Sequence, residues 1–91
     1  MTTLLMKHSV ADYDSWFAVF TAHQDVRTQH GATSHRVLRD GNDVVICLEF
    51  PDAESIAAFR ADPSLAAAMK EAGVVSVPEA TVLEEADARD Y

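Results

Sequence analysis

Apolar and polar residues alternate along the start of the chain, as they do on a strand with one buried face. Leu4, Met6, His8 and Val10 fall on one side of residues 3–10. Because side chains two positions apart on a strand share a face, this segment predicts a strand that carries a histidine within its apolar side.

The pattern then changes to helical spacing. Asp12 suits the N-cap position of a helix, and Gly31 suits the left-handed position after its last turn. Residues three or four positions apart between them form one broad face. This face consists of Tyr13, Trp16, Phe17, Phe20, His23, Gln24 and Arg27. The spacing predicts one continuous helix that ends near His30.

Two strands and a tight turn follow the helix. Residues 33–39 and 44–50 predict strands, the second almost continuously apolar, and the Asp-Gly-Asn-Asp sequence at 40–43 is a strong turn signal. A turn this short makes the two strands an antiparallel hairpin. In that register His35 shares a face with Leu48, the face that helices would cover.

A second helical segment begins after Asp52, which can cap it. Asp62 and Pro63 interrupt this segment, because an N-cap residue followed by proline favours a new helical start. We therefore expect the helix to restart or kink there and to end at Gly73.

The last apolar segment, residues 74–83, predicts a fourth strand, and Pro78 places it at a sheet edge or a bulge. The order β-α-β-β-α-β is typical of a ferredoxin-like α+β fold, with two helices on one face of a four-stranded antiparallel sheet. Residues 1–91 therefore predict a single domain, in which we expect the charged tail 84–91 to be frayed.

The face of the sheet opposite the helices is also apolar. Its predicted members are Leu5, Leu38, Val45, Cys47 and Val82. An apolar surface of this size is rarely left exposed on a monomer, so we expect a homodimer through this open sheet face. Arg36 and Glu49 lie nearly opposite each other on the same face and predict an ion pair at the interface.

Charge narrows the range of partners. The net charge of −8, with no basic cluster, argues against nucleic acid and anionic membranes. No apolar run is long enough to cross a bilayer, and the first ten residues do not resemble a signal peptide. The single cysteine, Cys47, cannot form an intrachain disulfide, so we expect a reducing compartment and a cytoplasmic protein.

Several segments resemble the small bacterial proteins grouped with the antibiotic biosynthesis monooxygenases, a family of dimeric α+β barrels. They are Val10-Ala11-Asp12-Tyr13-Asp14-Ser15-Trp16, Gly31-Ala32-Thr33-Ser34, Leu48-Glu49-Phe50, Phe59, Met69 and Ala72-Gly73-Val74. The resemblance implies the same barrel, built from two copies of this domain.

The resemblance also implies a choice of chemistries, because the superfamily includes cofactor-free oxygenases of polyketide-derived phenols, haem-degrading enzymes and small cyclases or isomerases. The haem-degrading type has an asparagine where this chain has His8, so haem is not expected. The cofactor-free oxygenases carry a tryptophan and a tyrosine in the second-helix region, where this chain has Phe59.

Three histidines provide the candidate chemistry. His8, His35 and His23 could converge between the sheet and the helices. The expected pocket lining for an aromatic substrate is Trp16, Phe20, Phe50, Phe59 and Met69. An imidazole titrates near neutral pH and can deprotonate a phenol or an activated C–H. We expect His8 and His35 to share one pocket and at least one of them to act as a base.

Other interpretations of the same residues remain open. Each of these histidines can be partly exposed or bonded to the backbone, and His30 suits a helix C-terminus, where the dipole favours a cation. Three imidazoles could hold zinc, but no tight ligand spacing is present, and we expect neither a metal nor a cofactor. A one-residue shift of the hairpin would replace His35 by Arg36 in the pocket, which would suit an anionic substrate.

The sequence therefore predicts a small-molecule enzyme that resembles cofactor-free monooxygenases of aromatic or polyketide-type substrates. A cofactor-independent cyclase or isomerase that uses histidine acid/base catalysis is one alternative. A ligand-binding dimer without catalysis is the other.

Overall fold

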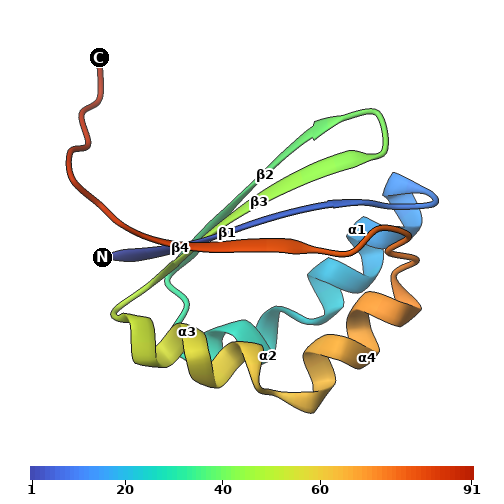
Figure 1. Ribbon diagram of the computed structural model, residues 1–91, viewed down its shortest axis with the longest axis horizontal. Helices are drawn as coiled ribbons and strands as arrows, with labels where there is room; N and C mark the ends of the chain where they lie inside the picture. The colour runs from blue at the N-terminus through green and yellow to red at the C-terminus, as the bar shows by residue number, and fades with distance from the viewer.

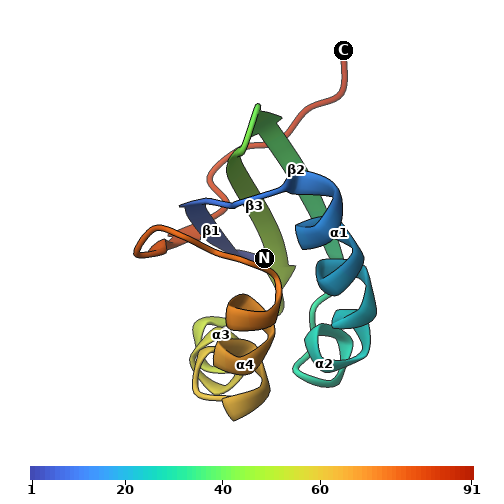
Figure 2. The ribbon, with the colours of Figure 1, turned by 90° about the vertical axis from the view of Figure 1, so that its right-hand side faces the viewer.

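A computed structural model describes all 91 residues, Met1–Tyr91, as one antiparallel sheet with helices on one of its faces (Figures 1 and 2). The strands are β1 (Thr2–Ser9), β2 (Ser34–Asp40), β3 (Asp43–Phe50) and β4 (Glu79–Glu84). The helices are α1 (Tyr13–Ala22), α2 (Gln24–Gln29), α3 (Ala53–Arg60) and α4 (Pro63–Glu71). The spatial order β2-β3-β1-β4 is that of a ferredoxin-like sheet, so the predicted α+β fold is confirmed.

Three aspartates begin helices as the sequence indicates. Asp12, Asp52 and Asp62 each accept a hydrogen bond from a backbone N–H in the first turn of α1, α3 and α4, at 2.8–2.9 Å. Pro63 occupies the start of α4, so the predicted restart after Asp62 is confirmed. These caps satisfy N–H groups that have no partner inside the helix.

The first helical segment is not continuous, contrary to the expectation from its spacing. It breaks at His23, whose φ and ψ of −87° and 2° lie outside the helical region. The N–H of His23 still donates to two carbonyls of α1, and the carbonyl of His23 accepts from Val26 and Arg27 of α2. One turn residue thus joins two helices while the apolar periodicity continues, which is why spacing alone does not reveal the break.

The core lies between the sheet and the helical layer. The sheet contributes alternate residues of β1 and β3, and the helices contribute Trp16, Ile56 and Phe59. Phe17, which helical spacing places on the buried face, is 41% exposed and stacks on Tyr13 instead. The buried stripe of α1 is therefore narrower than predicted and centres on Trp16.

The hairpin has the predicted register. Asp40 pairs with Asp43 around a two-residue turn, and His35 pairs with Leu48 on the face that the helices cover. Arg36 therefore lies on the open face, opposite Cys47. Glu49 accepts hydrogen bonds from the Thr3 hydroxyl at 2.8 and 2.9 Å, and it forms no ion pair with Arg36 within the chain.

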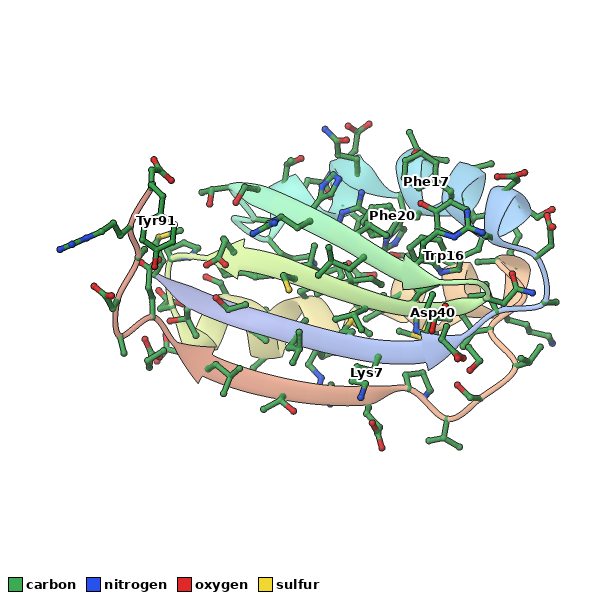
Figure 3. All side chains as sticks on the ribbon, turned by 90° about the horizontal axis from the view of Figure 1, so that it is seen from above. Lys7, Trp16, Phe17, Phe20, Asp40 and Tyr91 are labelled. Atoms are coloured by element: carbon green, nitrogen blue, oxygen red, sulfur yellow. The ribbon has the colours of Figure 1, made fainter.

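The open face, seen in Figure 3 with Lys7 labelled, is apolar along its middle. Leu5, Val45 and Cys47 are half-buried on it, and Leu38 is 51% exposed. Val82 does not belong to this face, contrary to the prediction, because it pairs with the core residue Leu4. The neighbouring Leu83 pairs with Thr3 and takes the place expected of Val82.

The carboxyl-terminal tail begins one residue later than predicted. Glu84 still belongs to β4, and its carboxylate accepts hydrogen bonds from the Thr2 hydroxyl at 3.0 and 3.1 Å. Residues 85–91 have no regular secondary structure and extend away from the sheet (Figure 1). None of the helices has the length and apolarity needed to cross a membrane.

Candidate functional site

A cavity of about 50 Å³ lies between the sheet and the helical layer. Most of its wall is apolar and includes Trp16 and Phe20 of α1, Phe59 of α3 and Met69 of α4. Its three polar lining residues are His8, His23 and Arg27. The alternation of β1 places His8 on the side of the sheet that the helices cover, and the cavity brings it together there with Arg27 of α2 and with His23 between α1 and α2.

His8 is buried without any hydrogen-bond partner. It extends from the helix-facing side of β1, where its neighbour across the sheet is Val44, and is only 7% exposed. Neither Nδ1 nor Nε2 has a partner, and the ring meets that of Trp16 edge-on, with 5.7 Å between centroids. Burial lowers the pKa of His8 below its ordinary value, because an apolar surrounding disfavours the imidazolium.

His23 lines the same cavity, but its side chain is hydrogen-bonded to the start of α4. Its Nε2 lies 3.1 Å from the hydroxyl of Ser64 at the start of α4. Burial is the main cause that lowers its pKa, and the charge of Arg27 lowers it further. His23 therefore connects the break between α1 and α2 to α4 and remains neutral at pH 7.

Arg27 is the polar residue of the cavity that the sequence interpretation did not select. It is 3% exposed, its Nη1 donates to the Phe20 carbonyl at 2.8 Å, and its Nη2 has no partner. The guanidinium carbon lies 3.8 Å from the centroid of the Phe20 ring. Burial lowers its pKa to about 10, so it stays charged at neutral pH. The sequence did contain a signal for this residue, because Arg27 continues the inward-facing helical stripe formed by Trp16, Phe20 and His23.

Two predicted site residues lie outside this cavity. His35 is exposed on β2, its ring meets Phe20 edge-on at 5.1 Å, and it lines a separate cavity of about 70 Å³ that Arg27 also borders. His8 and His35 thus share a face of the sheet but not a pocket. Phe50 is fully buried in the core, where it packs against Phe59.

His30 has a structural role, because it contacts the residue that caps α4. Its Nε2 lies 2.9 Å from Oδ2 of Asp62, the residue that caps α4. The hydrogen bond from His30 is the main cause that lowers the pKa of Asp62 to about 2. This contact joins the end of α2 to the start of α4.

The cavity combines one neutral base, one fixed cation and an aromatic wall. His8 can accept a proton, Arg27 can pair with an anion, and the stacked rings of Trp16 and Phe20, 5.0 Å apart, can contact a flat ligand. Its volume is below the ~150 Å³ of a cavity that holds benzene, so an aromatic ligand has to displace flexible wall residues such as Met69. Nowhere do three histidine, cysteine or acidic side chains gather in a way that could hold a metal ion.

Comparison with known proteins adds information on the fold. No family model and no curated protein sequence matches the chain. Among solved structures, the cofactor-independent oxygenase SnoaB of Streptomyces nogalater superposes with a TM-score of 0.80 at 16% identity, over 96% of this chain and 94% of that one.

Two further structures have the same arrangement. A putative antibiotic biosynthesis monooxygenase of Deinococcus radiodurans has a TM-score of 0.73 at 16% identity, over 100% and 98% of the two chains. A monooxygenase of Streptomyces coelicolor, solved in complex with nanaomycin D, has a TM-score of 0.71 at 17% identity, over 99% and 91%. The resemblance seen in the sequence is confirmed for the fold, which this chain shares with structures described as antibiotic biosynthesis monooxygenases.

Proposed function

We propose that this protein is a cofactor-free oxygenase of flat, phenol-like aromatic molecules, with His8 as its base. The similar structures include a cofactor-independent oxygenase and a monooxygenase solved in complex with nanaomycin D. The cavity of this chain offers the two features that such a reaction needs, an apolar aromatic wall and a neutral base within it.

The unpartnered imidazole of His8 is the observation that carries the proposal. A buried polar group without a partner costs roughly 1–3 kcal/mol in measured protein variants. A residue that only filled the core could be leucine without this cost. The lowered pKa keeps the ring neutral, and a base must be neutral to accept a proton.

The reaction begins with a proton transfer to His8. Loss of the phenolic proton gives a phenolate that is electron-rich enough to pass one electron to O₂, and the radical pair joins to form a C–O bond. The peroxide takes back the proton from His8 and becomes a hydroperoxide. The hydroperoxide then loses the hydrogen on the same carbon as a proton and expels hydroxide, and this proton and the hydroxide form water. The balance is phenol plus O₂ to quinone plus water, so O₂ supplies both the oxidant and the inserted oxygen atom.

The aromatic wall positions the substrate in this proposal. Trp16 and Phe20 stack on one side of the cavity, and Phe59 and Met69 line it from the other helices. His23 holds α4 in place through Ser64 and contacts the substrate only secondarily. His35, outside this cavity, is not needed for the proton transfer.

Oxygen uptake with anthrone or 1-naphthol, measured with an electrode and by chromatography of the quinone, tests the function. His8→Gln should lower the rate by about 10²–10⁴-fold, as expected for the loss of a general base. His35→Gln is the matched control and should keep most of the rate. Equal loss in both variants, or full activity of His8→Gln, contradicts the assignment of His8.

The same assay separates the alternatives. A change of the substrate without oxygen uptake identifies a cyclase or isomerase, which uses the same proton transfer. Tight binding without any turnover identifies a ligand-binding protein. Either result contradicts the oxygenase proposal and supports the corresponding alternative.

The proposal includes a homodimer through the open sheet face, within a reducing compartment in which Cys47 stays a free thiol. Leu5, Leu38 and Val45 give this face an apolar centre, and a stable interface buries about 800 Å² on each partner. Val45→Asp should convert the dimer to a monomer in sedimentation experiments, because a buried unpaired charge is costly. A monomeric wild-type protein at micromolar concentration contradicts the dimer.

A further inference from the structure

Arg27 is a buried cation for which the chain supplies no anion. No acidic side chain lies within ion-pair distance of Arg27; the one contact of an acidic with a basic side chain in the structure joins His30 to Asp62. The guanidinium has a carbonyl on Nη1 and an aromatic ring beneath it, but Nη2 has no acceptor. Arginine is rarely buried to this extent unless it is paired, because the desolvation of an unpaired charge costs several kcal/mol.

The surroundings of Arg27 favour an anion. No carboxylate lines the cavity, although the chain as a whole carries a net charge of −8. The other polar lining residues, His8 and His23, are both neutral at pH 7 because burial lowers their pKa values. The cavity therefore has a local positive charge inside an acidic protein, and an apolar wall strengthens its effect.

Arg27 and His8 lie toward opposite ends of the cavity. His8 pairs with Val44 of β3, whereas Arg27 also lines, together with Leu48, a second cavity further along the same strand. Trp16 contacts His8, Phe20 contacts Arg27, and the two rings stack on each other between them. A ligand that reaches both polar ends is consequently flat and elongated.

We propose that the natural ligand is an aromatic acid, whose carboxylate accepts a hydrogen bond from Nη2 of Arg27 while its ring system lies along Trp16 and Phe20 toward His8. This inference rests on the proposed function for the His8 end and adds the substrate class. The carboxylate provides the acceptor that Nη2 lacks, and a charge-assisted bond of this kind is stronger than a neutral one.

Binding of a matched pair of compounds tests the proposal. The probes are 6-hydroxy-2-naphthoate and its neutral amide, 6-hydroxy-2-naphthamide, which have nearly the same shape. Isothermal titration calorimetry at pH 7.5 measures their dissociation constants for the wild-type protein, Arg27→Met, Arg27→Lys and Arg60→Met. Arg60 is an exposed arginine of α3 and serves as the matched control.

The wild-type protein should bind the carboxylate about 30-fold more tightly than the amide, the effect of a buried charge pair worth about 2 kcal/mol. Arg27→Met should remove this preference, Arg27→Lys should retain part of it, and Arg60→Met should leave it unchanged. A wild-type protein that binds both compounds equally, or neither at millimolar concentration, overturns the proposal. Retention of the preference in Arg27→Met overturns it as well. Thermal melting confirms that each variant is folded, and Arg27→Lys decides the result if Arg27→Met does not fold.

The oxygen assay separates this inference from the proposed function. If the carboxylate binds through Arg27 but no oxygen is consumed, the anion site stands and the oxygenase proposal fails. If the amide is oxidised as fast as the carboxylate, the oxygenase proposal stands and the anion site fails.

Discussion

Two groups of polar side chains between the sheet and the helices differ in how their hydrogen bonds are satisfied. In the bonded group, His23 contacts Ser64 and His30 contacts Asp62, so that each imidazole joins α1 or α2 to α4. In the unpartnered pair, both nitrogens of His8 and Nη2 of Arg27 have no partner in the chain. The first group stabilises the packing of the helices, whereas the second lowers the stability of the protein without a ligand.

This difference separates structural histidines from candidate functional ones without reference to their positions in the sequence. The chain has four histidines, and helical or strand periodicity places three of them on the helix-facing side. Only the hydrogen-bond partners distinguish His8 from His23. Natural proteins retain unfavourable buried groups mainly where function requires them, so His8 and Arg27 are the positions where stability and activity should change in opposite directions.

The largest expected effect on stability comes from the replacement of Phe59. This residue packs against His23 and His30 of the bonded group and against Phe50 of the core. Phe59→Ala should lower the free energy of unfolding by about 3–5 kcal/mol. Phe17→Ala is the matched control and should have a far smaller effect, because Phe17 is 41% exposed. Urea denaturation measures both, and similar losses would show that the core boundary on α1 is misplaced.

The second largest effect on stability concerns His8 of the unpartnered pair. His8→Leu should raise the free energy of unfolding by about 1–2 kcal/mol, because it replaces two unpartnered buried nitrogens by a side chain of similar size. The same variant should have no oxygenase activity. A lower melting temperature for His8→Leu would show that the imidazole has a partner and belongs with the bonded group.

Removal of a bonded histidine should lower the free energy of unfolding, whereas removal of His8 should raise it. His30→Ala should lower the melting temperature, because Asp62 loses the partner that joins α2 to α4. The proposed oxygenase activity should change little at temperatures where the variant remains folded. A large loss of rate in a fully folded His30→Ala protein would contradict the division into two groups.

The smallest effects concern the pH dependence of stability. The pKa of His8 is lowered on folding, so the unfolded chain binds more protons below about pH 6.5, and stability falls as the pH decreases through that range. The pKa of Asp62 is lowered to about 2, so its contribution is present above about pH 4 and is lost as the pH falls toward 2.

Two variants separate these pH ranges. His8→Leu should reduce the loss of stability between pH 6.5 and 5, where His23 and His35 still contribute, since burial lowers their pKa values as well. Asp62→Asn should reduce the loss below pH 4, where the capping residues Asp12 and Asp52 also contribute. Melting temperatures across pH 2–8 provide the measurement, and an unchanged profile for either variant would contradict the lowered pKa of the residue that it replaces.

Four features could be predicted from the amino-acid sequence: the order of the elements, the three aspartate caps, the hairpin register and the face on which His8 lies. These features depend on neighbours in the chain, such as Asp62 before Pro63 or the two-residue turn between Asp40 and Asp43, and on the period of two along a strand. The expected lining residues Trp16, Phe20, Phe59 and Met69 were found for the same reason, since each lies within a regular apolar stripe.

The break at His23, the place of His35 outside the cavity of His8 and the burial of Arg27 without an anion became evident only from the three-dimensional structure. Each depends on contacts between segments that are distant in the sequence, such as His23 with Ser64 or Arg27 with the ring and carbonyl of Phe20. Periodicity specifies which side of an element faces inward, but it does not specify which buried polar group finds a partner there. That depends on the positions of atoms in three dimensions, and it is what distinguishes the candidate base and its cation from the structural histidines.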